Sequence, residues 1–305
     1  MSPLSPILTD FYASSKNHYW LVTQEPMLCT TILMISSRHH ILSGPGVSSR
    51  AYSVHHRLWQ HCQHLILRIV LGQEKVSKAK TRRIGTIEAL LLISEWYPRA
   101  VHFPPETDGW DSDLIMTAPD FRDPPGMDDE LPMSQRWKED VVEPSRRLDR
   151  MSWMLINTAL GLAHELGVFA PKGLQGGRVQ NGTVNPDAEA YLGHLEQRSQ
   201  RLPILLFLFT DLLASRIGCT SSMPADLNNI SYHGEDADWV CFMESWTELT
   251  KSTRSITNQY LLPSEKDSEG RLGDLSYLRE TKVWLSQHED DLLKFQGKPV
   301  VHFII

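Results

Sequence analysis

Apolar side chains recur at helical spacing between about residues 49 and 71. Intervals of four, four, three and four separate the members of this set, which are Val54, Leu58, Cys62, Leu65 and Ile69. Such intervals place the side chains on one face of a helix, with mostly polar residues on the other face. Gly72 follows the last member, at a position where glycine commonly ends a helix. The pattern therefore predicts an amphipathic helix that ends at Gly72.

Similar spacing predicts further helices and almost no strand. The additional helical segments cover about residues 26–38, 81–96, 148–166, 187–217, 239–260 and 275–295. The run "IEALLLI" at residues 87–93 is apolar nearly all round, which favours a central, buried helix. Pro203 should kink the long segment around it or split it in two. We therefore predict an all-α fold, an irregular bundle of about eight helices.

Residues 97–143 form the exception to this helical pattern. Seven prolines occur there, and residues 106–143 contain twelve acidic side chains against three basic ones. Proline and charge repulsion both oppose a regular element, so we expect a long, acidic, Pro-rich surface connection. Its mixture of carboxylates with Trp110, Leu114, Ile115 and Met116 also suits an activation-type segment. A solvated loop is the simpler interpretation of the same composition.

Composition and charge exclude several classes of protein. The chain has 305 residues, of which 41% are hydrophobic and 22% charged, which is typical of a globular protein. Its net charge of −7 argues against a surface that binds nucleic acid throughout. The four cysteines form no CxxC pair, and no signal peptide is evident, so a reducing compartment is expected. No apolar run approaches the roughly 20 residues that span a bilayer.

No motif in the sequence predicts catalysis, a metal site or a cofactor site. The segment "AHELGV" has Val168 where a zinc protease motif needs its second histidine. The segment "HHRLWQHCQH" carries His61 and His64 on one helical face, but nothing nominates further metal ligands. Phosphate-binding glycine loops and the nucleophile elbow of hydrolases are absent from the sequence. We therefore expect a protein that is not an enzyme.

A cluster of basic residues precedes the buried helix. It consists of Lys75, Lys78, Lys80, Arg82 and Arg83. Such a cluster can act as a nuclear-import signal or contact phosphate. A solvated loop that leads into a helix would have the same composition, and both interpretations stay open.

The stretch "EWYPRAVHFPPETDGWD" at residues 95–111 combines aromatic, charged and proline residues. Either a catalytic loop or a rigid joint between helices would suit this mixture, and the joint is favoured because Pro98 stops the preceding helix. We expect the Arg99 side chain to pair with a carboxylate, with Glu106 and Asp108 as candidates, or to cap helix-end carbonyls. The residues of the predicted joint are Glu95, Trp96, Pro98, Arg99, His102, Pro104, Pro105, Glu106 and Trp110.

Four blocks of the sequence resemble the regulatory domain of fungal zinc-cluster transcription factors, also called the middle homology region. They are "EPMLCTTILMISSRHH" (25–40), "GQEKVSKAKTRRIGTIEALLLISEWYPRAVHFPPETDGWDSD" (72–113), "RLDRMSWMLINTALGLAHELGVF" (147–169) and "LFLFTDLLASRIGCTSSMP" (206–224). The second block is the most specific, and the joint residues serve as its markers. This block resembles the branch that contains regulators of amino-acid and nitrogen catabolism.

The resemblance implies a nuclear, RNA polymerase II-specific regulator that acts through partner proteins or a small-molecule effector, without a membrane. Residues 1–305 would form one helical regulatory domain that stops within the family's domain. The family's six-cysteine zinc cluster has no counterpart among Cys29, Cys62, Cys219 and Cys241, so we expect no cofactor here. Zinc and DNA contact would then belong to a module absent from this chain. The alternative is a stand-alone helical ligand-binding or scaffold protein without DNA contact.

Overall fold

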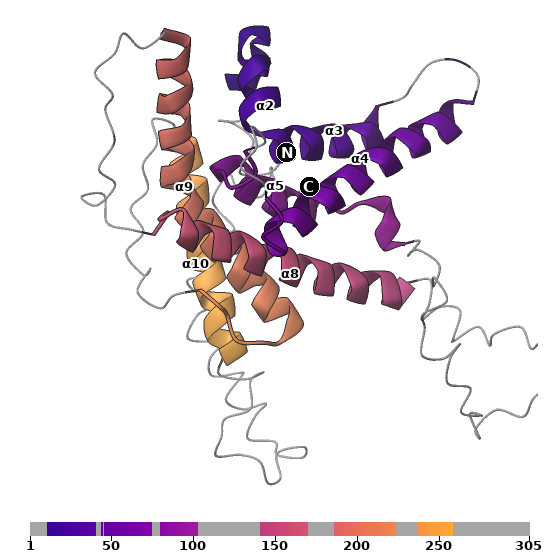
Figure 1. The fold of residues 1–305 in the computed structure, drawn as a ribbon. Coiled ribbons are helices and arrows are strands. Elements are labelled where there is room, and N and C mark those ends of the chain that lie inside the picture. Colours follow the sequence, from indigo (N-terminus) through magenta and orange to yellow (C-terminus); the bar gives the residue numbers. More distant parts are fainter. Residues whose placement is uncertain are drawn as a thin grey trace, which may run out of the picture. The chain divides into compact units, whose positions relative to one another are not determined.

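A computed structural model describes residues 11–40, 44, 46–74, 80–102, 141–169, 186–223 and 237–258 (Figure 1). Within these ranges the chain forms helices and their connections and no strand, which confirms the prediction of an all-α fold. The chain divides into two compact units, one covering Phe11–Gly167 and the other containing the described residues from Val168 onward. The expectation of one domain over residues 1–305 stays a prediction.

The first unit contains most of the described helices. They are η1 (Ser15–Asn17), α2 (His18–Gln24), α3 (Pro26–His39), α4 (Val47–Val70), α5 (Ile84–Glu95), η2 (Arg99–Val101) and α8 (Glu143–Glu165). Helix α3 packs against α4 and α5, and α5 packs against α8. Figure 1 shows α3 and α4 side by side, with α5 near one end of the pair. Helix α5 is therefore the element that α3 and α8 share.

Helix α5 is buried almost throughout, as its apolar sequence predicts. Ile87, Leu90, Leu91 and Ile93 are fully inaccessible to solvent. Fully burying a side chain of this size contributes roughly 1.5–3 kcal/mol relative to leaving it exposed. Helices from both sides cover this segment, so it forms the centre of the first unit.

Helix α4 forms where the apolar spacing predicts it, but its buried face differs in part from the predicted one. Cys62, Leu65 and Ile69 are buried as expected, whereas Val54 is exposed. The buried face begins instead with His55 and Trp59. These residues continue the spacing of about 3.6 residues in register with Cys62.

Glycines end two helices of the first unit, and Gly72 does so at the predicted position. Gly72 has φ 61° and Gly167 has φ 70°, a left-handed conformation that glycine adopts without steric cost. After α4, the backbone N–H of Gln73 donates to the carbonyl of Arg68 at 2.9 Å, which closes the helix in the Schellman manner.

Cys62 lies in the interface between α3 and α4. Its Sγ is 3.9 Å from the hydroxyl of Thr31 on α3, and both side chains are completely buried. Burial raises the pKa of the Cys62 thiol to about 11, although the Thr31 hydroxyl opposes part of this shift. The thiol is therefore protonated near neutral pH and packs as a small apolar group.

The second unit contains α9 (Pro186–Ile217) and α10 (Ala237–Ile256), which pack against each other. Helix α9 continues through Pro203, so of the two predicted effects of this proline the split is wrong and the kink stays a prediction. Asp211 of α9 has no exposed side-chain surface and accepts a hydrogen bond of 3.0 Å from Nη1 of Arg254 on α10. The hydroxyl of Ser221, in the segment after α9, also donates to Asp211. This buried carboxylate therefore connects three parts of the second unit.

Two expectations fall outside the described residues. They are the helix at residues 275–295 and most of the acidic connection, from residue 103 to residue 140. None of the described helices is both long and apolar enough to cross a membrane.

Candidate functional site

The candidate site is the joint at Trp96–His102, which leads from α5 into η2. Helix α5 ends at Glu95, and the N–H of Trp96 makes its last hydrogen bond, to Leu92 at 2.7 Å. Pro98 is extended, with φ −71° and ψ 155°, and η2 follows it directly. Proline cannot donate a backbone hydrogen bond and disfavours helix in the residue before it, which explains the break at this point.

His55 of α4 holds the joint against α3. The backbone N–H of Arg99 donates to Nε2 of His55 at 3.2 Å. Nε2 must then be unprotonated, so Nδ1 carries the proton and donates to the carbonyl of Met34 at 3.1 Å. The Ser37 hydroxyl lies 3.1 Å from the same Nδ1 and donates to the Met34 carbonyl at 2.6 Å. One imidazole thus connects α3, α4 and η2 through both of its nitrogens.

The environment of His55 favours this neutral form. Its side chain is only 2% exposed, and burial lowers the pKa of His55. The positive charges of Arg38 and Arg99, together with His56, lower it further, and the hydrogen bond with Met34 opposes them. Protonation would place a charge in this buried position and remove the acceptor that Arg99 uses.

Arg38, at the end of α3, contacts the first part of the joint. Its guanidinium donates to the carbonyl of Tyr97 and lies over the Tyr97 ring, 5.4 Å from the centroid. This arrangement combines a carbonyl cap with a cation–π contact. Next to it, the His39 ring meets Trp96 edge to face at 5.8 Å. The end of α3 therefore fixes the two aromatic residues that follow α5.

Helix α8 contacts the far end of the joint and also the last turn of α5. Nη1 of Arg147 donates to the carbonyl of Val101 at 2.9 Å, and the Ser152 hydroxyl donates to the carbonyl of Ser94 at 3.2 Å. Carbonyls at helix ends have no partner within the helix, so side-chain donors of this kind stabilise them. The joint is consequently held from α3, α4 and α8 at once.

The structure describes five of the predicted joint residues. Pro98 is buried, Trp96 and Arg99 are half-buried, and Glu95 and His102 are exposed, with the His102 ring 5.8 Å from that of Tyr97. Pro104, Pro105, Glu106 and Trp110 lie outside the described residues, as does Asp108. The pairing of Arg99 with Glu106 or Asp108 therefore stays a prediction.

The side chains from neighbouring helices that hold the joint in place were not predicted from the sequence. Capping of helix-end carbonyls was expected from Arg99, but Arg38 and Arg147 cap the carbonyls of the joint from neighbouring helices. His55 is the first residue of the histidine-rich segment "HHRLWQHCQH", which gives no sign of its role. No local pattern singles out these three residues, because their partners lie 44 to 59 positions away along the chain.

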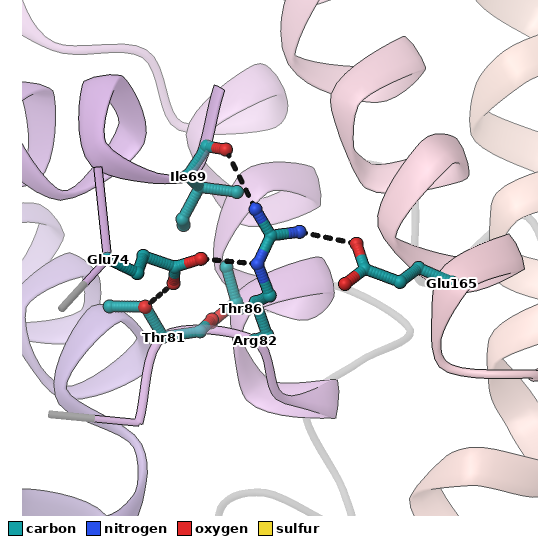
Figure 2. A network of polar contacts seen from close by, with 6 residues as sticks. All are labelled: Ile69, Glu74, Thr81, Arg82, Thr86 and Glu165. Atoms are coloured by element: carbon teal, nitrogen blue, oxygen red, sulfur yellow. Dashed lines mark hydrogen bonds and ion pairs between the residues drawn. The ribbon is translucent and has the colours of Figure 1, made fainter. Parts of the chain in front are cut away.

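A second polar network surrounds Arg82, and Figure 2 shows it from close by. The Arg82 guanidinium pairs with Glu74 through Nε and with Glu165 of α8 through Nη1, and its Nη2 donates to the carbonyl of Ile69 at 3.2 Å. Thr81 donates to the other oxygen of Glu74. Arg82 therefore connects the end of α4, the segment before α5 and the end of α8 (Figure 2).

The charges around Arg82 explain why its pKa is raised. Partial burial alone would lower the pKa of Arg82, but the hydrogen bonds and negative charges of Glu74 and Glu165 outweigh it, so the pKa is raised. Because arginine is charged at every ordinary pH, this shift reports a favourable environment for the cation rather than a titrating site.

The basic cluster divides into structural and exposed members. Arg82 pairs with carboxylates in the polar network, and Lys80 donates to the side-chain carbonyl of Gln24. Arg83 is exposed. Lys75 and Lys78 lie outside the described residues. The interpretation as an import or phosphate-contact signal stays a prediction, and among the described members it falls on Arg83.

The described residues contain no group of three or more histidine, cysteine, aspartate or glutamate side chains that could hold a metal ion. The cysteines are free thiols, of which Cys62 is buried and Cys241 is exposed. The joint and the Arg82 network consist of hydrogen bonds and ion pairs between helices. Their arrangement is suited to fixing the relative positions of those helices.

Comparison with known proteins gives one informative similarity. The chain is 47% identical over 273 residues to "Transcription factor hmgR" of Aspergillus fumigatus, a match that covers 85% of this chain and 35% of the relative. The chain is thus similar to part of a fungal transcription factor. No family model matches the chain. No solved structure matches it either.

This similarity supports the coarse part of the expectation drawn from the four sequence blocks. The relative's name describes a transcription factor, which agrees with the class of protein that the four blocks resemble. The chain spans about a third of the length of that relative. What the whole relative does therefore bears on this chain only as a proposal.

Proposed function

We propose that this chain is a helical regulatory part of a fungal transcription factor and acts in the nucleus on genes transcribed by RNA polymerase II. One observation carries the proposal, which is the 47% identity to a fungal transcription factor over 273 residues. The all-α fold agrees with it, because regulatory modules of this kind work through helix packing and partner contacts.

The joint provides a physical means for such regulation. Tyr97, Arg99 and Val101 of the joint contact α3, α4 and α8 respectively, so a ligand or partner that prefers one arrangement of these helices would shift the balance between arrangements. Partner proteins or a small-molecule effector supply this preference. DNA contact, and the zinc that supports it in the resembling family, belong to a separate module.

The resemblance of the block at residues 72–113 extends the proposal to target genes. That block is similar to regulators of amino-acid and nitrogen catabolism, so we infer that this chain regulates catabolic genes of that class. Growth on an amino acid as the nitrogen source, compared with growth on ammonium, is the condition expected to change its activity.

A reporter assay tests the proposal. The complete 305-residue chain is fused to a heterologous DNA-binding module and expressed in a fungal cell with a matching reporter gene. The proposed function predicts several-fold higher or lower reporter expression than the module alone produces. It further predicts that this difference changes between ammonium and an amino acid as the nitrogen source.

Two variants connect the assay to the joint. His55→Ala, which removes the acceptor for Arg99, should reduce the effect on the reporter, whereas Met154→Ala at an exposed position of α8 should preserve it. Reporter expression equal to that of the module alone, with the fusion present at normal abundance in the nucleus, would refute a regulatory role. That result would favour the scaffold or ligand-binding alternative.

A further inference from the structure

The segment from Pro26 to Gln73 contains no aspartate and no glutamate. These 48 residues would hold about six carboxylates at the frequency of the whole chain, which has 37 in 305 residues. The segment has four arginines and no lysine, so its formal charge is +4. The rest of the chain then carries −11, since the whole carries −7. The acidic residues are therefore segregated away from α3 and α4.

Helix α4 presents much of this segment to solvent. With 24 residues at 1.5 Å each, the helix is about 36 Å long. Its buried face starts at His55 and runs through Cys62 to Ile69, and the opposite side is exposed along the whole length. A partner could therefore contact several turns of α4 at once.

The exposed side of α4 has two adjoining stripes. The first contains Tyr52, His56, Leu67 and Val70, which share one side of the helix at intervals of four, eleven and three. Tyr52, Leu67 and Val70 are 46%, 53% and 55% exposed, and the Tyr52 and His56 rings stack with their planes 4° apart. The large apolar groups thus lie near the two ends of the stripe, with the exposed Gln63 between them, and exposed apolar groups of this size are a common feature of protein-binding surfaces.

The second stripe contains Arg57, His61 and His64, all of which are exposed. It lies next to the first on the helical surface, and no carboxylate of α3 or α4 neutralises it. An apolar stripe beside one that carries the charge of Arg57 and two imidazole rings complements an amphipathic segment that has both apolar residues and carboxylates.

We propose that this exposed side of α4 docks an acidic amphipathic segment of a partner protein. The apolar residues of that segment would cover Tyr52, Leu67 and Val70, and its carboxylates would pair with Arg57. A nucleic-acid ligand suits the surface less well, because phosphate contacts rely on many lysines and arginines and the rest of the chain is strongly negative. The inference deepens the proposed function by specifying the chemistry of the partner.

A binding assay with the complete chain tests this docking surface. The probe is a fluorescein-labelled 20-residue peptide of glutamate and leucine at helical spacing, followed by fluorescence anisotropy. The double variant Tyr52→Ala/Arg57→Glu should raise the Kd of this probe at least tenfold. The matched double variant Met154→Ala/Arg150→Glu changes the same kinds of exposed side chain on α8 and should leave the Kd within twofold.

Further probes decide between the possible outcomes. A peptide with lysine in place of every glutamate should bind at least tenfold more weakly than the acidic peptide. Leu67→Glu provides a second variant on the surface, and circular dichroism of each variant confirms that it is folded. Failure of the acidic peptide to bind, or equal losses in both double variants, would overturn the inference.

Tighter binding of a labelled 20-base-pair DNA duplex, lost in the α4 variant, would overturn it in favour of a nucleic-acid surface. The result is separable from that of the reporter assay. Peptide binding without any reporter effect would leave the docking surface standing and refute the transcriptional role. A reporter effect without peptide binding would support the transcriptional role and refute the docking surface.

Discussion

The backbone N–H of Arg99 donates a hydrogen bond of 3.2 Å to Nε2 of His55. His55 belongs to a different helix, α4, and its side chain is almost completely buried. The contact joins residues 44 positions apart and fixes the imidazole in its Nδ1-protonated form. It makes the start of η2 depend on α4.

Replacing His55 should destabilise the protein. His55→Ala leaves the Arg99 N–H without its acceptor and opens a cavity between α3, α4 and η2, which together should cost about 2–4 kcal/mol in the free energy of unfolding. Urea denaturation followed by circular dichroism measures this loss. The exposed His64→Ala on the same helix serves as control and should change the free energy by about 0.5 kcal/mol or less.

Stability should also depend on pH through His55. Its pKa is lowered in the folded protein, so below the ordinary histidine pKa of about 6.5 the unfolded chain binds this proton more readily. The stabilising effect is fully present above that pH and is lost as the pH falls towards the folded-state pKa. Between these pKa values the free energy of unfolding should decrease by up to about 1.4 kcal/mol per pH unit.

The measurement compares urea denaturation at pH 7.5, 6.5 and 5.5 for the wild type and for His55→Phe, which cannot titrate. A steeper dependence in the wild type is expected. Parallel curves for the two proteins would show that His55 does not contribute.

Removing Arg82 should have a moderate effect. Both carboxylate partners are partly exposed, and such ion pairs contribute only about 0–1 kcal/mol each, but Arg82 also caps the Ile69 carbonyl. Arg82→Ala should therefore lower the free energy of unfolding by about 1–2 kcal/mol. Arg83→Ala, an exposed neighbour of the same charge, should be nearly neutral. Thermal denaturation measures the loss of stability in both variants. Equal losses in Arg82→Ala and Arg83→Ala would show that the network does not stabilise the fold.

The buried carboxylate of Asp211 should make Arg254 important for the second unit. Arg254→Met removes the cation that pairs with the fully buried Asp211 carboxylate and leaves Ser221 as its remaining partner among the described residues, which should cost about 2–4 kcal/mol. The control Lys251→Met breaks an exposed pair with Glu248 on the same helix and should cost about 0.5 kcal/mol or less. Chemical denaturation with a probe in α9 or α10 distinguishes the two variants.

The double variant Asp211→Asn/Arg254→Met should recover part of the loss, because it no longer buries an unpaired charge. If the double variant were as unstable as the sum of both single variants, the coupling between the two residues would be absent.

Helix positions were predictable from the sequence because they depend on local spacing. The apolar run of α5 implied burial on all sides, and Gly72 marked the end of α4 through a backbone conformation that other residues adopt at a cost. The buried face of α4 was only partly predictable. His55 is polar by type, and it is buried because Met34, Ser37 and Arg99 satisfy its nitrogens.

The side-chain contacts that hold the joint in place could not be predicted from local spacing. Arg38 reaches Tyr97 across 59 positions and Arg147 reaches Val101 across 46, so both contacts arise only once the helices have packed. Periodicity carries no information about such pairs. Pro203 shows a related limit, because the cost of proline within α9 is outweighed by buried neighbours such as Leu202, Leu205 and Leu206.

The burial of Cys62 gives the protein a natural chemical reporter. With a pKa of about 11, only about one Cys62 thiol in a thousand is a thiolate at pH 8, and the thiol has no access to solvent. An alkylating reagent should therefore modify the exposed Cys241 quickly and reach Cys62 only when α3 and α4 separate. The rate at which Cys62 is labelled would then measure how often this helix pair opens, without any engineered probe.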